Sequence, residues 1–365
     1  KIPNIDKYDA MIEMGGPMDT WQEDTYPWLT KEKESIHNFV SVKKKPYLGL
    51  CLGAQLLGEA IGGKVRKMKT PEIGVLNVSI DNDKTIFSGL DKNLNSIDFG
   101  NYEGRLKIGG IKLILDGSPQ GKTAYLTEPY YKPPHNESDS YKGYPLIPQS
   151  EVSKWVKKYA DLNIPIMAHA NGDAAADMLI KAVKDADITS DHRTIMIHAQ
   201  TVREDQLDQM NELKIIPSYF STHTFYWGDW HRDSVFGQDR AMRISPTKST
   251  LSRKMPFTVH NDAPVVPPDM IRLLWSTTNR KTRSGKVLGE EQKISTYEAL
   301  KAITINAAYQ HFEDDIKGTI EVGKLADLVV LSENPLSMKT QDLLNLSIVA
   351  TYSHGQKIYQ ATSEK

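Results

Sequence analysis

Apolar and polar residues in the first part of the chain alternate as expected for short strands and helices. Apolar runs over 8–16 and 46–50 are typical of buried strands, and the apolar spacing over 31–45 and 54–63 is typical of helices. A third strand is predicted over 72–81. Alternating strands and helices of this kind predict a partial doubly wound, flavodoxin-like α/β fragment.

A polar, glycine-rich stretch over 88–104 interrupts this pattern, so we place a domain boundary between residues 95 and 103. Beyond it, apolar runs of strand length are separated in several places by helical patterns. These runs are IKLIL, IPIMAHA, TIMIHAQ, KIIPSYF and MPFTVHND. Repeated strand–helix units with polar residues at the carboxyl ends of the strands predict a (β/α) barrel of the TIM type over 103–315. A last section, 316–365, predicts short β strands outside the barrel.

Composition narrows the expected partners. The chain has 365 residues, 25% of them charged, and a net charge of −1, so nothing in its charge favours nucleic acid or an anionic membrane. No apolar run reaches the length of a membrane-spanning helix. A single cysteine excludes an internal disulfide and favours a reducing compartment, the cytoplasm. The chain begins with Lys1 rather than Met, so we expect an incomplete amino terminus. A homo-oligomer is left open.

The only cysteine, Cys51, lies in the sequence G-L-C-L-G between a predicted strand and a predicted helix. Gly49 and Gly53 allow a sharp turn at this point, and such turns hold nucleophiles in a strained backbone conformation. A helix that begins beside the sulfur favours the reactive thiolate. A buried, inert cysteine is the ordinary alternative for a lone cysteine, whereas the strand–turn–helix context favours a nucleophile.

The stretches YDAMIEMGGPMDTWQEDTYPWL and PYLGLCLGAQLLGEAIGGKV resemble class I glutamine amidotransferases, over roughly residues 8–80. The resemblance implies that Cys51 attacks the side-chain amide of glutamine, and that the backbone N–H groups of Gly16 and Leu52 stabilise the oxyanion. The family completes its triad with a downstream His-x-Glu pair. One such pair, His135 and Glu137, lies in a loop-like stretch of the second region, so the resemblance leaves Cys51 without an assigned base.

Four segments after residue 100 carry a lysine, histidine or aspartate at or near the end of an apolar strand-like run. They are GGIKLILDGSPQGKTAYL, IMAHANGDAAADML, RTIMIHAQ and TVHNDAPVVP. One such histidine is ordinary in a protein core. Several at successive strand ends converge on one mouth of a barrel, where imidazole nitrogens and a carboxylate can hold a divalent cation.

These segments, together with GTIEVGKLADLVVLSENPL near the end, resemble family 3 of the amidohydrolase superfamily, the YtcJ-like metal-dependent hydrolases, over about 103–360. The resemblance implies that Lys112 is carboxylated and bridges two metal ions, that His169 and His198 bind the second ion, and that Asp262 binds the first. It also implies one or two divalent ions, with zinc as the expected metal. The metal activates water for attack on a small amide-like substrate at a carbon–nitrogen bond other than a peptide bond. Asp262 then transfers the proton.

His223 and His231 stand among aromatic residues in STHTFYWGDWHR. They are candidates for shaping the substrate pocket, and packing within a loop is the open alternative.

The first metal ligands of the superfamily are missing. The superfamily opens its barrel with a strand ending in His-x-His, but no two of the ten histidines here are separated by one residue. His260 lies two residues before Asp262, and same-strand geometry makes it no obvious substitute. The early barrel strands are absent as well, which predicts an incomplete barrel with an open edge. Three hypotheses stay open: a metal-dependent hydrolase with an impaired site, a glutamine amidotransferase, and a non-catalytic remnant or chimera of two truncated frames.

Overall fold

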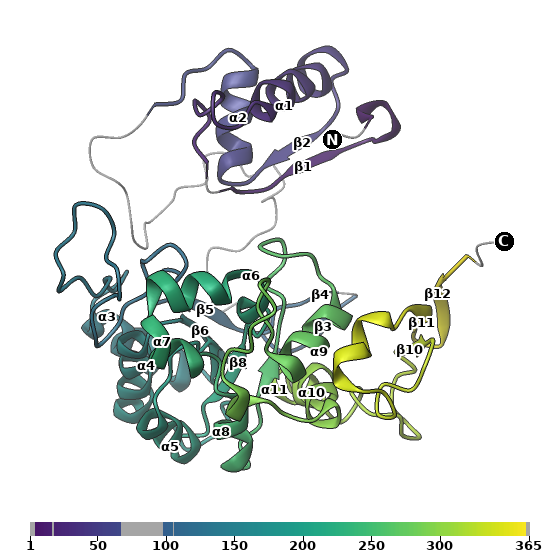
Figure 1. Cartoon of the computed structure of the whole chain (residues 1–365). Coiled ribbons are helices and arrows are strands. Elements are labelled where there is room, and N and C mark those ends of the chain that lie inside the picture. The colour runs from purple at the N-terminus through teal and green to yellow at the C-terminus, as the bar shows by residue number, and fades with distance from the viewer. Residues whose placement is uncertain (1–3, 17, 67–97, 105, 363–365) are drawn as a thin grey trace. The chain divides into compact units, whose positions relative to one another are not determined.

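The computed structural model describes residues 4–16, 18–66, 98–104 and 106–362 (Figure 1). The chain separates into two compact units, residues 1–73 and 74–365. Each unit has a parallel sheet and a hydrophobic core of its own. The strand predicted over 72–81 and the predicted end of the first domain at residue 95 lie outside the described residues.

The first unit contains two parallel strands, β1 (Met11–Glu13) and β2 (Tyr47–Gly49). Helix α1 (Trp28–His37) lies between them in sequence and continues as a π-helical turn over Asn38–Val42. Helix α2 (Leu52–Ala60) follows β2 and packs on α1. The buried side chains that join these elements are Leu29, Ile36, Leu52 and Leu56. The predicted order of strand, helix, strand and helix is therefore found, after a short 3-10 turn at Ile5–Lys7.

The second unit is built on a five-stranded parallel sheet with the strands in sequence order. The strands are β5 (Ile111–Ile114), β6 (Ile166–Ala170), β7 (Ile195–His198), β8 (Ile216–Tyr219) and β9 (Thr258–Val259). All five lie in the apolar runs that the sequence marks as strands. The predicted α/β class with parallel strands is confirmed, and closure of the strands into a barrel stays a prediction.

Helices cover one face of this sheet, as Figure 1 shows for α3 to α5. The described helices of the second unit are α3 (Gln149–Asp161), α4 (Asp173–Ala186), α5 (Glu204–Glu212), α6 (His223–Trp230), α7 (Gly237–Met242), α8 (Thr247–Ser252), α9 (Met270–Asn279), α10 (Thr296–Ile303) and α11 (Ile305–Gln310). A π-helical turn, His231–Val235, extends α6, and a 3-10 turn, Glu290–Gln292, precedes α10.

Strand residues alternate between the two faces of the sheet, and β5 shows what each face holds. Leu113 and Leu115 are buried in the core, whereas the alternating residues Lys112 and Ile114 are exposed on the opposite face. His169 pairs with Ile114 across the β5–β6 ladder, which places His169 on the same face as Lys112. The apolar side chains on one face of β5 therefore pack in the core, and the opposite face carries the candidate residues Lys112 and His169.

Short β strands follow the helices, as the sequence predicts for the last section. An antiparallel sheet contains β10 (Leu328–Leu331), β11 (Ile348–Ser353) and β12 (Gln356–Gln360), and a 3-10 turn spans Thr340–Asn345. A small antiparallel pair, β3 (Tyr102–Glu103) and β4 (Leu106–Lys107), precedes β5.

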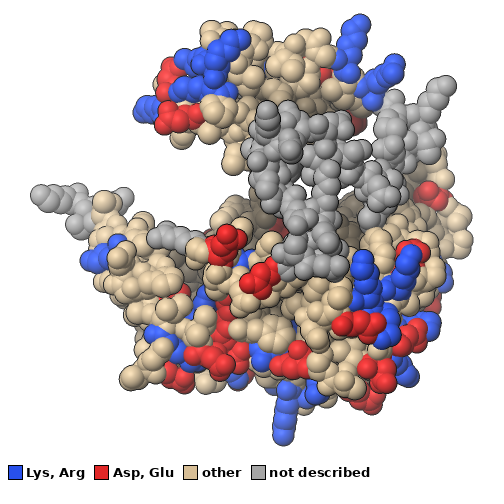
Figure 2. Space-filling view, turned by 180° about the vertical axis from the view of Figure 1, so that it is seen from behind, with Lys and Arg blue, Asp and Glu red and all other residues tan. Residues whose placement is uncertain are grey.

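The surface of the second unit carries both signs of charge. On the face seen in Figure 2, lysine and arginine side chains are interspersed with aspartate and glutamate. This mixture agrees with the net charge of −1. Among the described residues, none of the helices has both the length and the apolar composition needed to span a membrane.

Candidate metal centre

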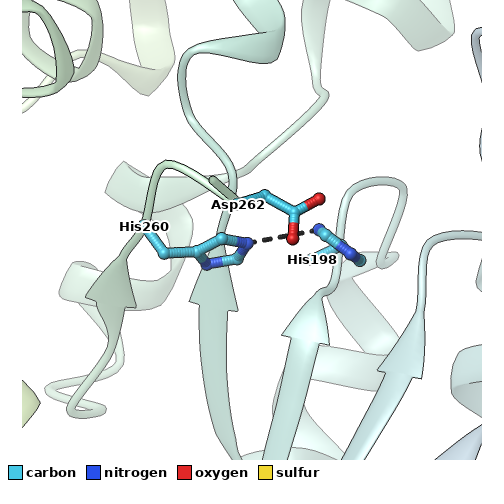
Figure 3. A group of neighbouring side chains, drawn as sticks. All are labelled: His198, His260 and Asp262. Atoms are coloured by element: carbon cyan, nitrogen blue, oxygen red, sulfur yellow. Dashed lines mark hydrogen bonds between the residues drawn. The ribbon is translucent and has the colours of Figure 1, made fainter. Parts of the chain in front are cut away.

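Three ligand-type side chains meet at the carboxyl ends of β7 and β9. His198 is the last residue of β7, and His260 and Asp262 follow β9 directly. One ligand atom of each lies within 4.8 Å of the others (Figure 3). The Nε2 atom of His260 is 3.3 Å from the Nδ1 atom of His198. Two imidazoles and one carboxylate form a donor set that suits zinc and similar divalent ions.

The imidazoles at this point are in the protonation state that metal binding needs. Burial lowers the pKa of His198 well below its ordinary value, and the charges of His169 and His260 lower it further. Burial lowers the pKa of His260 to about 3. Both rings are therefore neutral near pH 7, and each has a nitrogen lone pair available for a cation.

The backbone holds two of these side chains in an uncommon conformation. His198 has φ of 74° and Asp262 has φ of 54°, which is the left-handed region that residues with a Cβ rarely adopt. Ala199, next to His198, has φ of 45°. Such conformations cluster at functional sites because the surrounding fold must enforce them. Their occurrence at two strand ends supports a functional role for this corner of the second unit.

His169 lies beside His198, and its Nε2 atom contacts the segments that follow β5 and β6. Its ring centre is 4.5 Å from that of His198, in an edge-on arrangement. Its Nε2 atom lies 3.1 Å from the carbonyl oxygen of Gly117 and 3.0 Å from the side-chain nitrogen of Asn171. Burial lowers the pKa of His169, the charge of Lys112 lowers it further, and the charge of Asp262 opposes this. The predicted residues Lys112, His169, His198 and Asp262 thus share one electrostatic environment.

Lys112 is exposed on β5, on the sheet face that also carries His169. Its positive charge lowers the pKa of His198 and of His260, which indicates that the ammonium group lies in the neighbourhood of both rings. An ammonium group has no lone pair for a cation, so Lys112 can serve as a ligand only after its charge is removed.

Asp116 fixes the loops around His169. Its side chain is fully buried and accepts hydrogen bonds from the backbone N–H groups of Tyr125, Asn171 and Gly172 at 3.0, 2.9 and 2.8 Å. Burial raises the pKa of Asp116 to about 7, although the three donors lower it. One of its carboxylate oxygens is 3.6 Å from Nε2 of His169. Asp116 therefore ties the segment after β5 to the segment after β6.

Cys51 of the first unit occupies a strained turn. It has φ of 54° and ψ of −115°, its side chain is exposed, and α2 begins at the next residue. A Cβ built on Gly49 would lie 2.6 Å from the backbone nitrogen of Ala54, and a Cβ built on Gly53 would lie 2.4 Å from the carbonyl oxygen of Glu13. Glycine at these two positions lets the backbone approach closely, as the sequence predicts for a nucleophile turn. Leu52 begins α2 and is buried, and its side chain lies near Gly16.

The sequence model of the amidohydrolase family matches residues 68–359. The chain belongs to the amidohydrolase family. A second model, that of the class-I glutamine amidotransferases, matches residues 1–105 of this amidohydrolase. Both resemblances found in the sequence are thereby confirmed.

Curated relatives match the two parts of the amidohydrolase separately. The protein YtcJ of Bacillus subtilis, whose name is that of an amidohydrolase, is 26% identical over 70% of this chain and 48% of its own length. The N-substituted formamide deformylase of Arthrobacter pascens is 25% identical over 70% of this chain and 46% of its own length. One of the subunits of the glutamine-hydrolyzing GMP synthase from Sulfurisphaera tokodaii is 37% identical over 24% of this chain and 44% of its own length. The chain thus spans about half the length of the relatives it matches.

A solved structure supports the fold. An uncharacterized metal-dependent hydrolase from Pyrococcus horikoshii is 27% identical, with a TM-score of 0.57. The similarity covers 66% of this chain and 48% of that protein.

His223 and His231 of the amidohydrolase are both buried near the metal centre. The ring centre of His223 lies 6.1 Å from that of His198 and 5.6 Å from that of His231. Among the described residues, Nδ1 of His223 and Nε2 of His231 have no hydrogen-bond partner. Both rings also pack on aromatic neighbours, His223 on Phe220 and His231 on Phe236. The structure thus places the rings of His223 and His231 side by side, and the ring of His223 near that of His198.

Two residues of this corner were not predicted from the sequence. His260 joins His198 and Asp262 because the chain leaves β9 after Val259 and turns at Asp262, so strand geometry does not govern these two side chains. Two ligand-type residues spaced i, i+2 at a strand end were the available signal. Asp116 could have been noticed as a carboxylate that directly follows the apolar run of β5.

Proposed function

We propose that this amidohydrolase hydrolyses a carbon–nitrogen bond other than a peptide bond in a small, amide-like substrate, with the help of a divalent metal ion. The observation that carries the proposal is the convergence of His198 and Asp262 with neighbouring imidazoles at the carboxyl ends of parallel strands. The name of the Arthrobacter pascens relative, a deformylase of N-substituted formamides, supports a substrate of this class.

His198 and Asp262 would hold the metal, with His169 and a carboxylated Lys112 as the further ligands that the family resemblance implies. Neutral imidazoles and carboxylate oxygens favour zinc over calcium or magnesium. The bound ion would activate water for attack on the carbonyl carbon. We infer one or two ions, because the His-x-His pair that serves the first ion in the superfamily is absent from this sequence.

The chain's own residues would handle the proton and the substrate. The carboxylate of Asp262 can accept the proton of the attacking water and return it to the leaving nitrogen. His223 and His231 would line the substrate side, since both rings are neutral: burial lowers the pKa of His223 well below its usual range and that of His231 to about 3. Neutral imidazoles with an unpartnered nitrogen suit the N–H and C=O groups of an uncharged amide.

The finer features of the fold belong to the same proposal. We infer that β5 to β9 form part of a (β/α) barrel whose first strands are missing, and that the first unit is a partial flavodoxin-like fragment. The single cysteine favours a reducing compartment such as the cytoplasm. A homo-oligomer would be one way to cover an open sheet edge.

The proposal is tested by metal analysis together with hydrolysis of a panel of N-formyl and N-acetyl amines. We expect zinc in the purified chain, and substitution Asp262→Asn should lower kcat by about 10²–10⁴, the usual contribution of a general acid–base. Asp185→Asn, at an exposed residue on α4, is the matched control and should keep full activity. Unchanged turnover in the Asp262 variant would show that Asp262 has no role in the mechanism. A purified chain without metal and without activity would contradict the proposed hydrolase function.

A second function is supported for the first unit alone. The strained backbone of Cys51 at the start of α2 favours the glutamine amidotransferase chemistry of the family that residues 1–105 match. The first unit contains a single histidine, His37, whose Nδ1 atom lies 2.8 Å from the carbonyl oxygen of Ala60. If neither chemistry is measured, the chain is a non-catalytic fusion of two partial enzymes.

A further inference from the structure

His260 stands where a metal ligand is needed. Its Nε2 atom lies 3.3 Å from Nδ1 of His198. One ligand atom from each of His198, His260 and Asp262 lies within 4.8 Å of the others. Figure 3 shows the two rings directed toward each other with the carboxylate beside them. The three side chains come from two strand ends, so the fold rather than a local turn brings them together.

The separation of the two nitrogens fits a shared cation. Zinc binds imidazole nitrogens at about 2.0–2.1 Å, so two ligands of a tetrahedral site lie roughly 3.3 Å apart. The distance between His260 and His198 is 3.3 Å. Without a cation, the same two nitrogens make a long N–H···N hydrogen bond, drawn as the dashed line in Figure 3.

The opposite nitrogen of His260 has its own hydrogen-bond partner. Nδ1 lies 2.9 Å from the hydroxyl oxygen of Ser218 on β8. The Thr258 hydroxyl lies 2.8 Å from that oxygen and 2.9 Å from Oε1 of Gln310. When the Thr258 hydroxyl donates its hydrogen bond to Gln310, the Ser218 oxygen can accept a hydrogen bond from the Nδ1–H group of His260. The lone pair of His260 then lies on Nε2, which faces His198 and Asp262.

Metal-binding histidines in proteins usually donate their other N–H group to such a partner, which fixes the tautomer and the ring orientation. The alternative tautomer places the proton on Nε2, where it faces a buried imidazole at a long distance. The hydrogen-bond chain through Ser218 therefore suits a His260 that binds a cation.

We propose that Nε2 of His260 is a ligand of the metal ion, beside His198 and Asp262, and replaces a ligand that the absent His-x-His pair would supply. Ser218 is the positioning residue that holds its ring. This inference rests on the proposed function, because it concerns the same metal.

The test is the affinity of the full chain for Zn²⁺, measured after metal removal by competition with a fluorescent zinc chelator. His260→Gln should weaken zinc binding by more than about 100-fold, since loss of a ligand costs more than the 10–100-fold typical of an outer partner. Ser218→Ala should weaken it by about 10–100-fold. With Co²⁺ in place of zinc, the visible bands of a tetrahedral site should be present in the unaltered chain and lost in His260→Gln.

Two control variants separate ligand loss from general damage. His192→Gln removes a partly buried histidine that contacts Thr194 and the carbonyl oxygen of Leu213, and Ser221→Ala removes a buried hydroxyl on the segment after β8. Both should bind zinc within about twofold of the unaltered chain. Circular dichroism of the metal-free variants checks that each is folded.

The outcomes distinguish this inference from the proposed function. If the unaltered chain binds zinc and a folded His260→Gln variant binds it equally well, the role of His260 is overturned while the hydrolase stands. If His260→Gln fails to fold, unweakened zinc binding by a folded Ser218→Ala variant overturns the inference. A chain that binds no zinc overturns both proposals together.

Discussion

At the scale of single residues, His231 makes the molecule sensitive to acid. It is fully buried between the rings of His223 and Phe236, and burial lowers its pKa from 6.5 to about 3. The unfolded chain binds a proton at this residue below about pH 6.5, whereas the folded chain does not. Stability contributed by the neutral ring is therefore complete above pH 6.5 and is lost as the pH falls toward 3.

We expect His231 to lower the free energy of unfolding by about 1.4 kcal/mol for each pH unit below 6.5. His231→Phe keeps a ring in place without a titrating group, so its unfolding free energy should depend less on pH by that amount. Urea unfolding of the metal-free chain at three values between pH 5 and 7, followed by tryptophan fluorescence, measures the difference. His354→Phe, at an exposed histidine, should keep the slope of the unaltered chain, and identical slopes in both variants would refute the argument.

The residue types at the metal centre could be predicted, but their orientation could not. Lys112, His169, His198 and Asp262 follow from strand-end positions and from the family resemblance. The contact of His169 Nε2 with Gly117 and the approach of His260 to His198 depend on ring orientation, which is set by neighbours distant in sequence. Ser218, for example, contacts a histidine 42 positions further along the chain.

At the scale of secondary structure, the junction of β6 and α4 controls the shape of the metal centre. Gly172 precedes α4, and its N–H group donates to the buried Asp116 carboxylate at 2.8 Å. A Cβ at this position would lie 1.8 Å from the backbone carbonyl oxygen of Tyr125. The backbone must move to accept any side chain, and the end of β6 with His169, together with Asn171, would move with it.

Gly172→Ala should therefore destabilise the second unit by about 1–3 kcal/mol, the usual cost of an overpacked site, and should weaken zinc binding. Chemical denaturation and the zinc competition assay measure the two effects. Gly109→Ala is the matched control, because a Cβ there meets no atom within 4 Å, and it should change stability by less than about 0.5 kcal/mol. Equal stability of the two variants would show that this junction tolerates a shift.

The strands of the second unit could be predicted because each lies in a mostly apolar run of strand length, as expected for parallel strands covered by helices. The positions of the helix ends were predicted less accurately than those of the strands. The helical spacing over 31–45 corresponds to α1 at Trp28–His37 and a π-helical turn that ends at Val42. Local spacing does not distinguish these helix types, because the change depends on how the helix packs on its neighbours.

At the scale of the whole molecule, the chain combines regions similar to two families, and the residues of each candidate site lie within one of the two units. The residues that shape the Cys51 turn lie within residues 1–73, and those around the metal centre lie within 74–365. The family matches cover the first and second parts of the chain, at 1–105 and 68–359, and overlap over 68–105. Each unit also has a hydrophobic core of its own.

We expect Cys51, the proposed nucleophile of the first unit, to react with an electrophile without catalytic turnover. Cys51 is exposed in a strained turn at the start of α2, which favours attack on an electrophile. Release of ammonia from glutamine also requires a base, and His37, the one histidine of this unit, lies against the carbonyl oxygen of Ala60. We expect a glutamine-analogue chloroketone to label Cys51 at one equivalent per chain, with no steady-state release of ammonia from glutamine. Mass spectrometry and a coupled ammonia assay measure the two results. Cys51→Ala should abolish labelling and leave zinc binding unchanged, whereas turnover that is lost in His135→Ala would instead assign the missing base to the second unit.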